Sequence, residues 1–241
     1  MEIIFLLTIF IIAYLYSSVG HGGASGYIAL MALFSIEPGL IRCSALIMNV
    51  FVSGIALLIF FKAGYFRWRI VFPFLILSIP FSFIGAWIEI DPRFYKIMLG
   101  ILLLLGVLRI LIRFQDSDTL KTPQFAVSIF LGALLGFVSG IIGIGGGIIL
   151  SPLLLIMRWA NVKEAAAASA LFILLNSSSG LLSLSFQSNI ILTPDIFLWV
   201  ITGITGATAG SFMGGYKLSY NTLRYVLSLV LILASYKLLI V

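Results

Sequence analysis

The stretch IRCSALIMNVFVSGIALLIFF, residues 41–61, decides the class of fold. It holds a single charged residue, Arg42, near its start, and the rest is apolar or uncharged. About 20 such residues are enough for an α-helix to cross the hydrocarbon core of a bilayer. The whole chain has the same character, with 62% hydrophobic residues, 9% charged residues and a mean hydropathy of +1.24. Soluble domains carry about 25% charged residues, so the sequence predicts an integral membrane protein.

Further apolar segments lie on both sides of this stretch. A polar segment at residues 114–124, which contains Asp116, Asp118 and Lys121, divides the chain into two halves with five apolar segments each. We therefore expect an all-α, polytopic membrane bundle made of a first repeat at residues 1–113, a linker at 114–124 and a second repeat at 125–241. The segments lie near residues 3–19, 24–36, 41–61, 70–88 and 94–112, and near 125–142, 148–159, 164–186, 195–213 and 222–240.

The two halves resemble each other in sequence, which indicates a duplication. The matches include Gly20-His21-Gly22-Gly23 with Gly143-Ile144-Gly145-Gly146-Gly147, Ser44-Ala45-Leu46 with Ser169-Ala170-Leu171, Gly85 with Gly210, and Asn49 near Asn176. Many transporters are built from duplicated halves and bind substrate where the halves meet. The second segment of each half is too short for a full crossing of about 20 residues, so we expect it to be short or re-entrant.

The positions of Lys and Arg predict how the halves are oriented. If each half crosses the membrane an odd number of times, the halves are inverted and most basic residues fall on one side; an even number leaves no bias. The positive-inside rule makes the rich side cytoplasmic, with the linker inside and both termini outside. Ten of the fourteen Lys and Arg are then cytoplasmic: Lys62, Arg67, Arg69, Arg109, Arg113, Lys121, Arg158, Lys163, Lys217 and Arg224.

The glycine-rich turns are the strongest candidates for a substrate site. Glycine permits positive φ angles and close backbone approach, and the helix that follows begins with N–H groups that lack intrahelical partners. Such N–H groups favour an anion. Two inverted halves would bring two such helix starts together near the middle of the membrane. The alternative is that the glycines only allow helices to pack closely.

Uncharged polar residues near the turns complete the candidate site. An amide cannot be satisfied within its own helix as readily as a serine hydroxyl, which often bonds to a carbonyl of its own helix. The sole histidine, His21, could carry a proton or act as a gate, although its counterpart in the second half is Ile144. The candidate substrate-binding residues are Gly20, His21, Gly22, Gly23, Ser25, Asn49, Gly143, Gly145, Gly146, Gly147, Asn176, Ser177 and Ser178.

The remaining composition argues against an enzyme. All eight acidic residues fall in loops or at segment ends, and the chain has one histidine and one cysteine, Cys43. A zinc site or a Ser-His-Asp triad would lack parts, so we expect no catalytic residue, no metal site and no cofactor. An excess of Lys and Arg in a membrane protein mostly sets orientation, and no stretch has the basic and aromatic character that nucleic-acid binding needs.

Several of these motifs together resemble the sulfite exporter TauE/SafE family. They are the turn at residues 143–147, Ser151-Pro152-Leu153 after it, and the small-residue stretch at 165–171, and the likeness covers nearly the whole chain. The resemblance implies a permease of the cell inner membrane that moves a small sulfur-containing anion, such as sulfite, thiosulfate or an organosulfonate, with a contribution from protons. Inverted repeats would work by alternating access. A passive anion channel is the alternative, followed by an intramembrane enzyme or an assembly factor, and the oligomeric state stays open.

Overall fold

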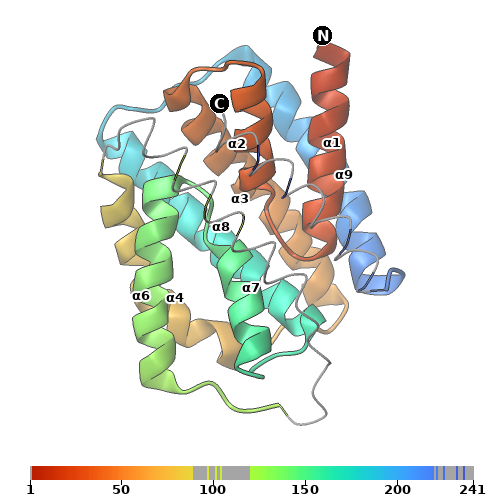
Figure 1. Cartoon of the computed structure of the whole chain (residues 1–241), viewed down its shortest axis with the longest axis vertical. Helices are drawn as coiled ribbons and strands as arrows, with labels where there is room; N and C mark the ends of the chain where they lie inside the picture. The colour runs from red at the N-terminus through yellow and green to blue at the C-terminus, as the bar shows by residue number, and fades with distance from the viewer. Residues whose placement is uncertain are drawn as a thin grey trace.

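The computed structural model describes residues 2–88 and 120–219, together with the single positions 97, 101, 104, 221, 225, 232 and 236. Over these residues the regular structure consists of eight α-helices (Figure 1). The predicted segments at 94–112 and 222–240, and the linker up to residue 119, lie outside the described residues except for single positions within them. The helices are α1 (Glu2–Ser18), α2 (Ala24–Leu33), α3 (Pro38–Lys62), α4 (Trp68–Ala86), α6 (Phe125–Ile142), α7 (Gly147–Ile156), α8 (Val162–Phe186) and α9 (Pro194–Tyr216).

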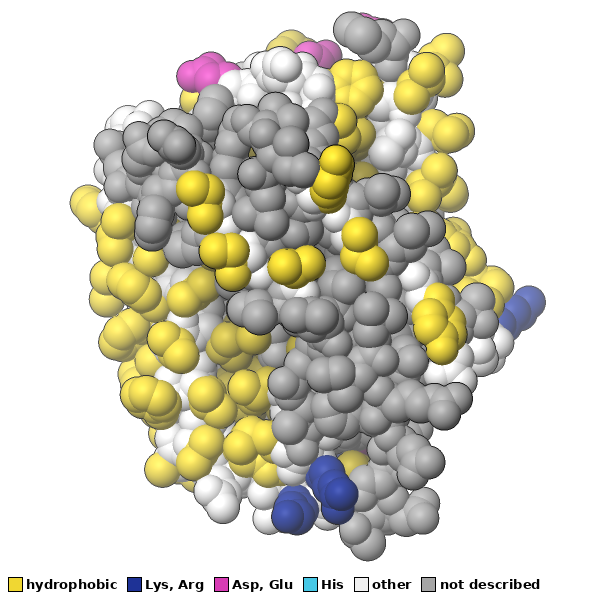
Figure 2. Space-filling view, in the orientation of Figure 1, with side chains coloured by type: hydrophobic (Ala, Val, Ile, Leu, Met, Phe, Trp, Pro, Cys, Tyr) yellow, Lys and Arg dark blue, Asp and Glu magenta, His cyan; other side chains and the backbone are white. Residues whose placement is uncertain are grey.

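Five of the described helices are long and apolar enough to cross a membrane, namely α3 from Gly39 onward, α4, α6, α8 and α9. Large apolar side chains on the flanks, such as Ile3, Phe130 and Phe197, are well exposed, and hydrophobic side chains gather over the visible flank (Figure 2). Such a surface is suited to lipid rather than to water. These features confirm the predicted class, an all-helical, multi-pass membrane protein.

The second helix of each half is short, as the sequence predicts. Helices α2 and α7 have ten residues each, which at 1.5 Å per residue is about 15 Å, or half of a hydrocarbon core of ~30 Å. Both end earlier than the predicted segments because a residue with positive φ follows, Ser35 (56°) after α2 and Arg158 (57°) after α7. The N–H of the following residue then donates to the carbonyl five residues back and ends the helix. Ile36 donates to Met31, and Trp159 donates to Leu154.

One end of the bundle is rich in basic residues, and the opposite end carries three of the described acidic residues. Arg67 pairs with Glu164 at 2.6 Å, Lys163 donates to the carbonyl of Gly215 at 2.8 Å, and the N–H of Lys121 donates to the carbonyl of Arg158 at 2.7 Å. These contacts gather the α3–α4 and α7–α8 connections and the end of α9 at what we call the basic end. The opposite, acidic end carries Glu2, Glu37 and Asp195, and Figure 2 shows both ends.

The described helices run in both directions between these ends. Helices α1, α3 and α9 begin at the acidic end, whereas α4, α6 and α8 begin at the basic end (Figure 1). The pair α1–α2 enters and returns at the acidic end, and the pair α6–α7 enters and returns at the basic end. Helices α3 and α8 pack against each other, α1 packs against α9, and α6 packs against α4.

Two glycine rows make the α6–α4 and α9–α1 contacts close. A methyl group on Gly132, Gly136 or Gly140 of α6 would meet the backbone of Phe74, Ser78 or Ser82 in α4. In the same way Gly206, Gly210 and Gly214 of α9 face the backbone of Phe10, Tyr14 and Ser18 in α1. A glycine at every fourth position lies on one face of a helix and lets two backbones approach, as is typical of membrane helices.

Candidate functional site

The two glycine turns have the backbone that their sequence predicts. In the first turn Gly20 and Gly23 have φ angles of 76° and 90°; in the second turn Gly143, Gly145 and Gly146 have φ angles of 77°, 78° and 73°. These values lie in the left-handed region, where a side chain is strained. Each turn reverses the chain inside the bundle and leads directly into a short helix, α2 or α7.

Asn49 in the middle of α3 joins the two turns. Its side-chain Nδ2 donates to the carbonyl of Ile144 at 3.0 Å and to the hydroxyl of Ser177 at 3.2 Å. Its Oδ1 accepts from the N–H of Ala24, the first residue of α2, at 3.1 Å. The side chain is fully buried. Asn49 therefore caps the short helix α2 of the first half and also holds the turn before α7 in the second half.

Residues of α8 contact the same turn glycines that Asn49 contacts. A methyl group on Gly145 would lie 2.8 Å from Ile173 Cγ2, 2.8 Å from Ser177 Oγ and 3.0 Å from Asn49 Nδ2. A methyl group on Gly22 would likewise overlap Asn49 Oδ1 and lie 2.9 Å from Ile173 Cγ2. Gly22, Asn49, Gly145, Ile173 and Ser177 thus form one buried cluster, which we call the turn junction.

Of the other turn glycines, Gly147 meets the junction at Ile173 and the rest face neighbouring residues. Their nearest contacts for an added methyl group are Ala166 for Gly20, Tyr27 for Gly23, Arg42 for Gly143, Phe172 for Gly146 and Ile173 for Gly147. Within the described residues the backbone N–H groups of Gly22, Gly23, Gly145 and Gly146 donate no hydrogen bond, and all four glycines are buried. Buried N–H groups are nearly always paired in proteins, so these donors are suited to a ligand.

His21 connects the first turn to the second half by a separate chain of hydrogen bonds. Its Nε2 lies 3.0 Å from the hydroxyl of Ser151 in α7, which lies 2.6 Å from the hydroxyl of Ser169 in α8. All three residues are buried. In the part of the chain that the structure describes, His21 Nδ1 has no hydrogen-bond partner. Neither Ser151 nor Ser169 is a candidate from sequence, although both stand in motifs that the sequence singles out.

Three candidate residues lie apart from the junction. Ser25 donates to the hydroxyl of Tyr16 in α1 at 2.9 Å. Asn176 donates to the hydroxyl of Ser78 in α4 at 3.2 Å and to the carbonyl of Phe172 at 2.7 Å. Ser178 is exposed on the bundle surface and bonds to the carbonyl of Leu174 in its own helix at 2.8 Å.

The helical repeat explains why Asn176 and Ser178 point away. Successive residues turn by about 100° around a helix, so when Ser177 faces the junction its two neighbours face elsewhere. The register set by Ser44 and Ser169 also pairs Asn49 with Leu174 rather than with Asn176, which lies two residues further on. The two asparagines are therefore on different faces of their helices.

The junction offers uncharged donors rather than charges or metal ligands. Over the described residues, no group of three or more His, Cys, Asp and Glu could hold a metal ion. The ion pair of Arg67 and Glu164 lies at the basic end, far along α8 from Ser177. Amide, hydroxyl and backbone N–H groups can hydrogen-bond an oxyanion without holding it as tightly as a buried cation would.

The fold and the buried junction define a multi-pass helical membrane protein, and the comparisons with known proteins add that it is a membrane transporter. A family model described as "Sulfite exporter TauE/SafE" matches residues 5–238. The chain therefore belongs to the TauE/SafE family, as its motifs indicate. A location in the cell inner membrane is consistent with this family and with the apolar helices.

Three curated relatives carry the same general description. The chain is 36% identical over 239 residues to "Probable membrane transporter protein y4hK" of Sinorhizobium fredii, which covers 97% of this chain and 96% of that one. It is 30% identical to "Probable membrane transporter protein MJ0441" of Methanocaldococcus jannaschii over 48% of this chain and 45% of that one. It is 23% identical to "Probable membrane transporter protein YunE" of Bacillus subtilis over 82% and 80%. No solved structure matches the chain.

Proposed function

We propose that this transporter moves a small sulfur-containing anion, such as sulfite, thiosulfate or an organosulfonate, and that the turn junction binds it. The observation that carries the proposal is the position of Asn49, whose one side chain contacts both glycine turns. An anion that binds the unpaired N–H groups of one turn would then lie close to the other turn. The name of the family, sulfite exporter, supports a sulfur oxyanion as the substrate class.

The chemistry of the junction supports an oxyanion as the ligand. Glycine N–H groups at the start of α2 and α7 combine unpaired donors with the positive end of a helix dipole. In a membrane interior such donors need a partner. The surrounding Asn49 and Ser177 add uncharged polar groups, so the anion is stabilised but can still be released.

We propose alternating access of two inverted repeats as the mechanism, with the first repeat at residues 1–113, the cytoplasmic linker at 114–124 and the second repeat at 125–241. Two features support the inversion: corresponding helices run in opposite directions, and the first helix of each half packs against the fourth helix of the other. In this scheme the glycine rows on α6 and α9 are the surfaces along which the halves move. The basic end faces the cytoplasm.

Protons are proposed as the coupling ion, with His21 as the group that carries them. It is the only histidine, it is buried beside the first turn, and its Nε2 is tied to Ser151 of the other half. A change of charge on this ring would alter a hydrogen bond between the halves. Intramembrane titratable groups are commonly functional.

Reconstituted proteoliposomes test this function directly. We expect saturable uptake of radiolabelled sulfite, thiosulfate or an organosulfonate, with accumulation driven by a pH gradient. A conductance without saturation or accumulation would identify a passive channel instead. Failure of every sulfur anion, with uptake of another anion, would contradict the substrate class while leaving transport itself intact.

A further inference from the structure

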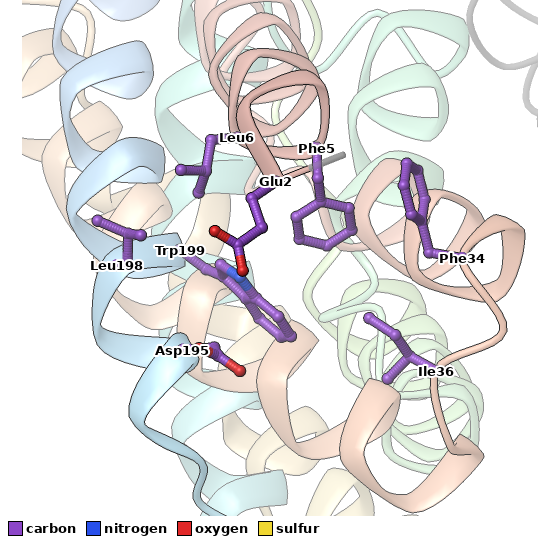
Figure 3. A pocket seen from close by; sticks show the side chains of 8 residues that line it. All are labelled: Glu2, Phe5, Leu6, Phe34, Ile36, Asp195, Leu198 and Trp199. Atoms are coloured by element: carbon purple, nitrogen blue, oxygen red, sulfur yellow. The ribbon is translucent and has the colours of Figure 1, made fainter.

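A separate cavity of about 260 Å³ opens at the acidic end (Figure 3). It lies between the start of α1, the connection from α2 to α3 and the start of α9, whereas the turn junction lies in the middle of α3 and α8. The cavity is lined by Glu2, Phe5, Leu6, Phe34, Ile36, Asp195, Leu198 and Trp199. The proposed anion site does not use any of these residues.

Three aromatic rings form much of the wall. The ring centre of Phe5 lies 4.9 Å from that of Phe34 at an interplanar angle of 76°, and 5.2 Å from that of Trp199 at 57°. Rings at such angles do not stack face to face, and Figure 3 shows them around a common space. The face of an aromatic ring carries a negative electrostatic potential and attracts cations, most strongly for tryptophan.

The charged groups of the cavity also favour a cation. Glu2 and Asp195 contribute carboxylates from the first turns of α1 and α9, and no Lys or Arg is among the lining residues. Within residues 2–88 and 120–219 neither carboxylate takes part in an ion pair or hydrogen bond. Two carboxylates beside three aromatic rings favour a cation over an anion.

The lining also limits which cation fits. A hard metal ion such as Ca²⁺ takes about six to eight oxygen ligands. The lining side chains offer only the oxygens of two carboxylates, beside the apolar Leu6, Ile36 and Leu198. The volume is below the roughly 300–1,000 Å³ of sites for drug-sized ligands, which favours a compact ligand. A cation that carries its own carbon groups satisfies both the charged and the apolar parts of the wall.

We propose that this cavity binds an alkylammonium cation between the rings of Phe5, Phe34 and Trp199 and the carboxylates of Glu2 and Asp195. The ammonium group could be carried by a free amine or by the headgroup of an aminophospholipid, since both present the same chemistry. The site is independent of the anion site, so its test does not involve transport.

Titration calorimetry on the purified full-length protein in detergent tests the proposal, with butyltrimethylammonium chloride as the probe and sodium chloride at equal ionic strength as the reference. We expect saturable binding by the wild type and an affinity at least fivefold lower for Glu2→Gln and Asp195→Asn. Trp199→Phe, which keeps an apolar ring, should weaken binding about threefold. Glu37→Gln is the matched control, because Glu37 is at the same end but does not line the cavity, and it should bind normally.

The source of the ammonium group is separated by a second arm. Native mass spectrometry of protein taken from phosphatidylethanolamine or phosphatidylglycerol nanodiscs should show retained phosphatidylethanolamine that Asp195→Asn loses, if the lipid is the ligand. Binding of the free amine without lipid retention assigns the site to a soluble amine. The proposal is overturned if the wild type binds neither ligand, or if Glu2→Gln and Asp195→Asn bind as well as Glu37→Gln while melting at the wild-type temperature.

Discussion

The side-chain amide of Asn49 donates a hydrogen bond of 3.0 Å to the backbone carbonyl of Ile144, 95 residues further along the chain. The oxygen of the same amide accepts from the N–H of Ala24 at 3.1 Å. The glycine turn of the second half is thus tied to a helix of the first half. Neither turn can shift relative to α3 without the loss of a buried hydrogen bond, which links the geometry of the two turns.

Replacing Asn49 with leucine should abolish transport and lower the melting temperature. Leucine has a similar volume but leaves the N–H of Ala24 and the carbonyl of Ile144 buried without this partner, at a cost of about 1–3 kcal/mol for each group. Uptake into proteoliposomes and the melting temperature in detergent would be measured together. Asn176→Leu should reduce stability but retain more transport, because its amide contacts Ser78 and Phe172 instead. Equal transport by Asn49→Leu and the wild type would show that the junction is not the site.

Replacing Gly145 with alanine should remove anion binding by more than its effect on stability explains. At Gly145 the backbone φ is 78°, where a side chain is strained, and the new methyl group would also lie within about 3 Å of three atoms. Ligand affinity and melting temperature would be compared on the same sample.

Two glycines provide matched controls for this variant. Gly64 has a φ of 82° but no atom within 4 Å of an added methyl group, so Gly64→Ala isolates the backbone strain of about 1–2 kcal/mol. Gly54 lies inside α3 with only Leu174 nearby, at 3.9 Å, so Gly54→Ala should be neutral or stabilise by up to ~1 kcal/mol. If Gly145→Ala binds substrate as well as these controls do, the turns have a purely structural role.

The glycine row on α9 should tolerate no side chain. A methyl group on Gly210 would meet the carbonyl of Tyr14 and lie 2.6 Å from Ser17 Oγ, so Gly210→Ala should destabilise the protein by about 1–3 kcal/mol. Gly215→Ala, on the same helix, meets only Ala63 and Ile59 at 3.9 Å and should be nearly neutral. Thermal melts of the two variants decide the point, and similar melting temperatures would mean that α1 and α9 separate easily.

The basic end should face the cytoplasm. Lys121→Cys should react with an impermeant maleimide only in inverted membrane vesicles, and Glu37→Cys only in intact cells, because these residues lie at opposite ends of the bundle. The natural Cys43 is fully buried and gives a low background. Labelling of Lys121→Cys from outside would reverse the proposed orientation.

Replacing His21 with glutamine should uncouple transport from the pH gradient. Glutamine can keep a hydrogen bond to Ser151 but cannot take up a proton at physiological pH. Uptake driven by the anion gradient alone should persist, whereas the stimulation by a pH gradient should disappear. Ser151→Ala, which removes the hydrogen-bond partner and leaves the imidazole, should weaken this stimulation without abolishing it. A full response of His21→Gln to the pH gradient would assign coupling to another group.

The features that depend on the local chain are predictable from the sequence. Apolar segments such as residues 41–61 require a membrane and form helices there, because a bilayer leaves backbone groups no other partners. The second segments are short because too few apolar residues separate the glycine turn from the next break. Positive φ angles at Gly145 and Gly146 agree with the expectation that a glycine-rich turn uses the backbone freedom of glycine. The exact ends of α2 and α7 are less predictable, because Ser35 and Arg158 adopt a left-handed backbone that serine and arginine do not signal.

Which polar residues meet at the site was decided only by the tertiary structure. Asn49, Asn176, Ser177 and Ser178 are all candidates in sequence, with the asparagines favoured over the serines. A helix presents each residue about 100° from its neighbour, and the rotation of α3 and α8 is set by packing against other helices. That packing turns Asn49 and Ser177 toward the junction, Asn176 toward α4 and Ser178 outward. The hydrogen bond from Asn49 to Ile144 exists because the middle of α3 and the turn between α6 and α7 meet in space, and local sequence carries no signal for a meeting of that kind.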